Sequence, residues 1–255
     1  MKIAVVGACE HNDWFARRLS ERGLPVDVDG TLPLPDLKRL LGQTWSGLVV
    51  NNMLVDTGAT SMVQRHVLAS TLHALGIEYA ELSGQWLHHG TEFGFAIFTG
   101  INAAHRTQLA PLLDALAPQP GAWLHCGPPG SGCYASRIFD ALAMACVLAL
   151  RAGWSGPGEP TRAPDWIAFF SQQKVLADKL LELSRLYLSL HPAHPVKDPW
   201  KQLESFSQPP MHQEHFSANL ARLLVLALGH HTATREILDS VMSGVAHGAM
   251  PVTAA

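Results

Sequence analysis

The feature that most constrains the fold is the alternation of short apolar runs with helical periodicity in the first half of the chain. The opening run KIAVVGA is short, apolar and ends near a glycine, so it predicts a buried strand that enters a turn. A helix should follow, with Asn12 as its N-cap, Phe15 and Leu19 on its apolar face, and Gly23 as its stop. The next run, PVDVDG, predicts a second strand. Such a β–α–β opening is typical of a dinucleotide-binding unit.

The alternation continues as far as Gly121. Strands are expected at GLVVNNMLVDTG, which holds one or two, and at IEYAEL and FAIFTG, which hold one each. Helices are expected at PDLKRLL, SMVQRHVLASTLHALG and NAAHRTQLAPLLDALA. Asn102 should cap the last of these helices. This order predicts a mainly parallel sheet. After Gly121 the strand signals vanish, and helices are expected from Cys133, Asp165 and Phe216. The predicted fold is α/β: a truncated Rossmann-like parallel-sheet domain (residues 1–120) followed by an all-helical domain (residues 121–255).

Composition excludes several classes of protein. Hydrophobic residues make up 47% of the 255 residues and charged residues 15%, which indicates a globular chain. The net charge is −3 and no Lys/Arg block occurs, so no nucleic-acid partner is expected. The four cysteines have no CxxC spacing, which argues against a zinc ribbon. The apolar runs ALAMACVLAL and LLVLALG are shorter than a bilayer span. A cytoplasmic protein without a membrane partner is expected.

The loop after the first predicted strand departs from a dinucleotide fingerprint. Of the three glycines that this fingerprint needs, only Gly7 is present. The side chains of Cys9 and Asn12 would crowd the pyrophosphate, and Glu10 would repel it. Asp29, at the end of the second strand, stands where an acid could hold a ribose hydroxyl. The alternative is that Gly7 is a turn glycine and Asp29 a solvated acid, so NAD(P) is a doubtful cofactor here.

A second glycine-rich loop, GPPGSG, leads directly into the helix CYASRIFDALAMA. Glycines permit tight turns, and the free N–H groups at a helix start attract anions. On the helix, Ser136, Asp140 and Ala143 share one face. By itself this pattern also suits a structural turn before a buried helix.

The whole stretch WLHCGPPGSGCYASRIFDALAMA closely resembles the signature of the 6-phosphogluconate dehydrogenase family, especially its short branch. VDTGATSMVQRHVLASTLHALGIEYAELSG, QLAPLLDALAP and FSANLARLLVLALGHH are similar to further motifs of that family, in the same order. The resemblance covers most of the first half and the closing helix, but not the stretch between Asp165 and Glu214.

The resemblance implies a nucleotide domain, a helical domain that forms a homodimer, and a cleft between them. The family oxidises 6-phosphogluconate with a nicotinamide cofactor and decarboxylates the product, using a lysine base and a glutamate acid. Here the lysine position is Ser136, the glutamate position is Ala143, and a substrate-holding asparagine is Asp140. Each positioned acid or base contributes roughly a hundred- to ten-thousandfold in rate, so oxidative decarboxylation is not expected.

The candidate residues follow from this alignment. Ser136, with Asp140 as its neighbour, and His231, at the position of a family histidine that reaches the partner's substrate site, are catalytic candidates. Ligand-binding candidates in the cleft are Ser83, Gly84, Ser131 and Gly132.

Three functional hypotheses remain open. The first is a repurposed family member that binds a small ligand for non-redox chemistry or as a partner subunit. The second is an NAD(P)-dependent oxidoreductase of altered specificity, with Asp140 or His231 carrying the proton. The third is a metal-dependent enzyme that uses histidine pairs such as His88–His89, His212 with His215, and His230–His231. No HExxH or comparable spacing occurs, so no metal is expected.

Overall fold

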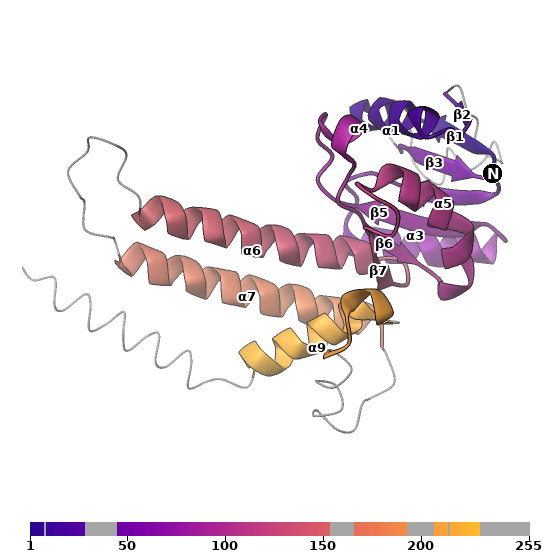
Figure 1. The fold of residues 1–255 in the computed structure, drawn as a ribbon. Helices are drawn as coiled ribbons and strands as arrows, with labels where there is room; N and C mark the ends of the chain where they lie inside the picture. The colour runs from indigo at the N-terminus through magenta and orange to yellow at the C-terminus, as the bar shows by residue number, and fades with distance from the viewer. Residues whose placement is uncertain (8, 29–44, 154–165, 193–206, 214, 230–255) are drawn as a thin grey trace, which may run out of the picture.

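The computed structural model describes residues 1–7, 9–28, 45–153, 166–192, 207–213 and 215–229 (Figure 1). A sheet with helices on both faces forms one end of the molecule, and long helices extend from it. The α/β class and the helical second part are therefore confirmed. The helix expected at PDLKRLL lies outside the described residues, as do Asp29 and His231.

Seven strands form one mixed sheet in the order β2-β1-β3-β4-β5-β6-β7. The strands are β1 (Ile3–Val6), β2 (Val26–Asp27), β3 (Gly47–Val50), β4 (Met53–Asp56), β5 (Glu78–Ser83), β6 (Phe98–Ile101) and β7 (Leu124–Gly127). Pairs β1/β2, β4/β5 and β6/β7 are parallel, whereas β1/β3, β3/β4 and β5/β6 are antiparallel. The expectation of a mainly parallel sheet is thus corrected. The two-residue connection of β3 to β4 is too short for the crossover that a parallel pair requires, and the connection of β5 to β6, residues 84–97, also returns the chain antiparallel.

The first of these connections is a hairpin between β3 and β4. Its two turn residues are Asn51 and Asn52, and Asn51 adopts a positive φ of 54°. Asparagine tolerates this conformation, which two-residue hairpin turns need. The hairpin sends β3 antiparallel beside β1, so that Gly47 pairs with Val6. The residues that enter β3, Trp45 and Ser46, therefore lie at the carboxyl end of β1.

The sheet also continues past Gly121, where no further strand was expected. β7 pairs with β6 in parallel and places Cys126 in the interior. The strand is short and contains His125, which interrupts the apolar run by which a buried strand is recognised. The helix after it begins two residues earlier than Cys133, at Ser131.

Two layers of helices cover the sheet. Helices α1 (Glu10–Glu21) and α5 (Arg106–Leu116) pack on one face, and α3 (Met62–Ala74) packs on the other. Strand residues alternate between the two cores: Ile3 and Val5 face α1, whereas Ala4 and Val6 face the side of α3. Short elements α4 (Gly90–Phe93), η1 (Ala103–His105) and η2 (Pro210–His212) lie in the connections.

The N-cap of α1 is Cys9 and not the expected Asn12. Asn12 lies inside the first turn and is buried, and its amide donates hydrogen bonds to Val6 O, Gly7 O and Ser46 Oγ (2.7 Å to the last). Its polar side chain is therefore used to join α1 to the entrance of β3.

The helical part consists of α6 (Ser131–Gly153), α7 (Trp166–Leu190) and α9 (Phe216–Gly229), with α6 and α7 side by side (Figure 1). At their sheet end Tyr134 stacks on Tyr187, with ring centroids 4.5 Å apart. Among the described residues, one segment, Ser131–Leu148 of α6, is long and apolar enough to cross a membrane. The runs ALAMACVLAL and LLVLALG are themselves shorter than a span, and the window reaches that length only with the residues of α6 that precede Ala141. A packed core helix passes the same test, and the start of α6 is buried against the sheet.

Arg18 connects α1 to the ends of two other helices. Its side chain is 2% exposed and donates to the carbonyl oxygens of Thr91 and Glu92 in α4, and of Ala115, Leu116 and Ala117 at the end of α5. Carbonyl groups at a helix end have no partner within the helix, and a cation there is favourable.

Arg18→Leu should lower the free energy of unfolding by about 3 kcal/mol, because it leaves these buried carbonyls unpaired. Arg17→Leu is the matched control: Arg17 makes an exposed pair with Glu21, so a change below about 0.5 kcal/mol is expected. Urea unfolding followed by circular dichroism measures both. Equal effects of the two substitutions would contradict the role given to Arg18.

Candidate functional site

A cavity of about 670 Å³ lies where β1, β4 and β5 end. Cys9 and His11 follow β1 and line this cavity. Residues 56–60 contribute from the end of β4, and Ser83, Gly84 and Trp86 from the end of β5. Trp45 and Ser46 come from the entrance of β3. Helix α6 completes the wall with Cys133, Ser136, Arg137 and Asp140. Ligands of open α/β sheets bind at such carboxyl ends, so the position is that of a binding site.

The floor of the cavity is a buried ionic network around Arg65 of α3. Its Nη1 donates to Glu81 Oε2 at 3.0 Å and to Ser83 Oγ at 2.6 Å, and its Nη2 donates to Gly58 O. Its Nε lies 3.7 Å from Asp56 Oδ2. Although burial alone would lower the pKa of Arg65, the two carboxylates raise it above its ordinary value, so the guanidinium stays charged.

The other oxygen of Glu81 organises the glycine-rich loop. Glu81 is fully buried, and its Oε1 accepts a hydrogen bond from Cys133 N at 3.0 Å in the first turn of α6. A Cβ on Gly132 would lie 2.6 Å from Phe98 O and 3.0 Å from Glu81 Oε1, so the absence of a side chain permits this approach. The anion that the start of α6 attracts is thus supplied by the protein itself.

The predicted ligand residues divide into two groups. Ser83 and Gly84 line the cavity. Ser131 is fully buried behind its wall, where its Oγ bonds Tyr187 Oη at 2.7 Å and its carbonyl accepts from Ser217. Gly132 is packed on β6 as described and does not line the cavity.

The predicted catalytic residues Ser136 and Asp140 both line the cavity. Asp140 Oδ1 accepts a hydrogen bond from Gln85 Nε2 at 2.9 Å, which joins α6 to the loop after β5. Within the part of the chain that the structure describes, the hydrogen bond of Asp140 goes to Gln85 and none joins it to Ser136. Among the described residues, no hydrogen bond therefore activates Ser136 as nucleophilic catalysis by a hydroxyl requires, and its catalytic role stays a prediction. His231, the third candidate, lies outside the described residues.

The turn after β1 requires a glycine at position 7. Gly7 has a positive φ of 88°, and a Cβ on it would lie 2.5 Å from Trp45 O and 2.9 Å from the Cα of Ser46. The first glycine of a dinucleotide fingerprint has this same role in the tight turn, whereas the second, which lets the backbone approach the pyrophosphate, is replaced here by Cys9. Glu10 adds a negative charge to the first turn of α1. The cofactor role of Gly7 stays a prediction.

The same turn holds a hydrogen-bonded pair that its sequence pattern does not indicate. Cys9 Sγ lies 3.0 Å from His11 Nδ1, and His11 Nε2 lies 3.0 Å from Thr57 Oγ1. All three residues line the cavity. In sequence the loop resembles an imperfect glycine fingerprint, and Thr57 lies 46 residues after His11, so the spacing Cys-x-His is the one signal of this pair in the sequence.

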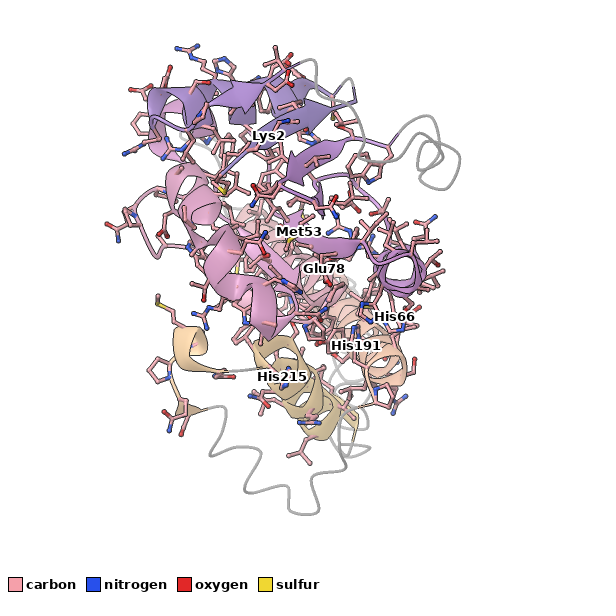
Figure 2. The ribbon with its side chains drawn as sticks, turned by 90° about the vertical axis from the view of Figure 1, so that its right-hand side faces the viewer. Lys2, Met53, His66, Glu78, His191 and His215 are labelled. Carbon is pink, nitrogen blue, oxygen red and sulfur yellow. The ribbon has the colours of Figure 1, made fainter. Side chains whose placement is uncertain are left out.

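No group of three or more His, Cys, Asp or Glu side chains suited to a metal ion occurs among the described residues. His66 of α3 and His191 after α7 lie together, with ring centroids 5.0 Å apart (Figure 2). His191 Nε2 donates to Pro129 O at 2.9 Å, so it serves to hold the glycine-rich loop. Two histidines with one nitrogen so engaged fall short of the three or four ligands of a zinc site.

Comparison with protein-family models finds no match, and comparison with curated protein sequences finds none either. Among solved structures, the chain is similar to an imine reductase variant from Myxococcus stipitatus in complex with NAD⁺ (TM-score 0.48, 12% identity, 96% of this chain and 94% of that chain). It is also similar to the 3-hydroxyisobutyrate dehydrogenases of Mycobacterium tuberculosis (TM-score 0.47, 14% identity, 88% and 99%) and Salmonella typhimurium (TM-score 0.43, 14% identity, 86% and 98%). Similarity at these values indicates nothing about substrate or cofactor. None of these three proteins is a 6-phosphogluconate dehydrogenase, so that narrower resemblance rests on the sequence motifs.

Replacing Arg65 tests the importance of the ionic floor. Arg65→Met should lower the free energy of unfolding by about 3–5 kcal/mol, because two buried carboxylates lose their counter-ion. Lys179→Met removes an exposed pair with Glu182 and should cost under about 0.5 kcal/mol. Urea unfolding compares the two; a small effect at Arg65 would show that the network is dispensable.

The three tyrosines provide a prediction of pH dependence. Tyr79, Tyr134 and Tyr187 are the only tyrosines, all are buried, and burial raises the pKa of each above the ordinary 10.0. The unfolded chain therefore loses these protons first, so stability is intact below about pH 10 and falls as pH rises above it. Tyrosinate absorbance should appear only together with unfolding measured by circular dichroism. A tyrosine that ionises in the folded protein near pH 10 would contradict this packing.

Proposed function

We propose that this chain is a repurposed relative of the 6-phosphogluconate dehydrogenases that binds a small polar ligand in the cavity and does not use a dinucleotide. The observation that carries the proposal is the chemistry of the turn after β1, where Cys9 replaces the second fingerprint glycine and Glu10 adds a negative charge to the first turn of α1. The second glycine lets the backbone approach the pyrophosphate of a cofactor. We therefore propose that no NAD(P) is required.

The lining suits a small polar molecule. The cavity falls within the range of about 300–1,000 Å³ that is usual for ligand sites. Its walls carry the hydroxyls of Thr57, Thr60, Ser83 and Ser136, and among the described residues Arg137 makes no hydrogen bond or ion pair. With Ser136 and Ala143 at the positions of the family's base and acid, the chemistry that the site supports is non-redox.

We further propose a cytoplasmic homodimer built on the helical part. This is supported by large apolar side chains that α6 and α7 leave exposed, among them Phe139, Leu142, Met144, Val147 and Val175. A second copy would remove this surface from water, which is the driving force of most association.

The cofactor is the point on which this proposal is tested. Titration of NADH and NADPH, followed by nicotinamide fluorescence, should give no saturation in the micromolar range, and 6-phosphogluconate with NAD⁺ or NADP⁺ should give no reduced cofactor. An authentic 3-hydroxyisobutyrate dehydrogenase serves as the positive control for the titration. Saturable micromolar binding would instead favour an NAD(P)-dependent oxidoreductase of altered specificity.

A further inference from the structure

Cys9 is placed differently from the other three cysteines. Cys126 and Cys133 are buried, and burial raises the pKa of both thiols. Cys146 is exposed on α6. Cys9 is partly exposed to the cavity and is the only one of the four with a histidine nitrogen within 3.0 Å of its sulfur in the described structure.

Both ring nitrogens of His11 have hydrogen-bond partners. Nε2 lies 3.0 Å from Thr57 Oγ1, and that hydroxyl can itself donate to Asn12 Oδ1 (3.3 Å) or Ser46 O (3.4 Å), so it is able to accept Nε2–H. In the tautomer with the proton on Nε2, Nδ1 is the acceptor for the thiol proton. The ring also lies against Phe15 and Trp86, with centroids 5.5 and 6.1 Å away.

Burial favours a neutral imidazole at His11. Burial lowers the pKa of His11, and the Asp56 carboxylate offsets only part of this effect. The cavity wall also carries the titratable or charged groups Arg65 of α3 and Cys133, Arg137 and Asp140 of α6. The first turn of α1 adds Glu10 and Asp13. A neutral histidine at neutral pH is able to accept a proton.

The Cys9 thiol also lies at the start of a helix, where backbone N–H groups can stabilise negative charge. Cys9 is the N-cap of α1, and its side chain accepts no hydrogen bond from the helix backbone. The first N–H groups of a helix have no partner within it. They are donors for negative charge on the sulfur or on an oxygen bound next to it.

We propose that Cys9 and His11 form a nucleophilic thiol site that adds reversibly to small aldehydes in the cavity. The thiol proton passes to His11 Nδ1, and the sulfur forms a bond to the carbonyl carbon. The π electrons of the carbonyl move to its oxygen, which takes the proton back from His11. The product is a hemithioacetal; nothing leaves and nothing is oxidised. This site goes beyond the function proposed above, because it requires a covalent bond at Cys9 whether or not NAD(P) binds.

Alkylation by iodoacetamide tests the nucleophile, since the sulfur displaces iodide and the thiol proton is taken up by His11. In the full-length folded protein at pH 6.5, mass spectrometry should show Cys9 modified roughly tenfold or more faster than N-acetylcysteine added to the same reaction, because an ordinary thiol is almost fully protonated there. The rate at Cys9 should also change less than that of N-acetylcysteine when the pH is raised to 8.5, because His11 and not the solvent takes the proton. Comparable rates and pH profiles for Cys9 and N-acetylcysteine would overturn the proposal.

Substitutions of His11 test whether this residue is the base that activates Cys9. His11→Phe keeps a ring between Phe15 and Trp86 but removes the base, and should reduce the rate at Cys9 by roughly tenfold or more without changing Cys146. His11→Gln provides a second variant if the first fails to fold. His73→Asn, at an exposed position in α3, is the matched control and should change neither rate. A His11 variant with the normal rate at Cys9 would refute activation by this residue.

Glycolaldehyde tests the class of electrophile. At millimolar concentration it should slow alkylation of Cys9, leave Cys146 unaffected, and lose its effect after dialysis, as a hemithioacetal requires. Equal slowing at both cysteines, or none, would overturn the assignment to aldehydes. Because NADH titration is a separate measurement, failure here leaves the proposal on the cofactor intact.

Discussion

The rest of the structure depends on the buried guanidinium of Arg65. It neutralises Asp56 at the end of β4 and Glu81 in β5, and Glu81 in turn accepts the hydrogen bond of Cys133 N at the start of α6. One cation therefore sets the floor of the cavity and the point from which the helical part extends. A buried ion pair stabilises a fold only when each carboxylate oxygen and each guanidinium N–H has a hydrogen-bond partner. The network around Arg65 meets that condition closely.

Much of the fold could be predicted from local periodicity, but strand direction could not. α1, α3, α5 and most strands have the expected pattern, with Gly23 and Gly76 beyond the helix ends at positive φ. Direction depends on how each strand is connected. The two asparagines between β3 and β4 were a hairpin signal that was available, whereas β7 is too short and too polar at His125 to stand out.

The candidate site, like the fold, could be predicted from the sequence only in part. Ser83, Gly84, Ser136 and Asp140 were predicted from motif positions and do line the cavity. Ser131 and Gly132 begin α6, and the sequence there resembles an anion-binding helix start. The group that takes this position, the Glu81 carboxylate, comes from a strand about 50 residues earlier and could not be inferred from the local sequence. The contact of His11 with Thr57 is equally distant in sequence, so it too had to come from the structure.

The β3–β4 hairpin also limits the sequence of the turn after β1. Main-chain atoms of Trp45 and Ser46 lie 2.5 Å and 2.9 Å from the place of a Cβ on residue 7, so only glycine fits there. A substitution at Gly7 would have to displace the segment that enters β3. A two-residue turn in one part of the sheet thereby restricts which amino acid can be accepted at the exit of another strand.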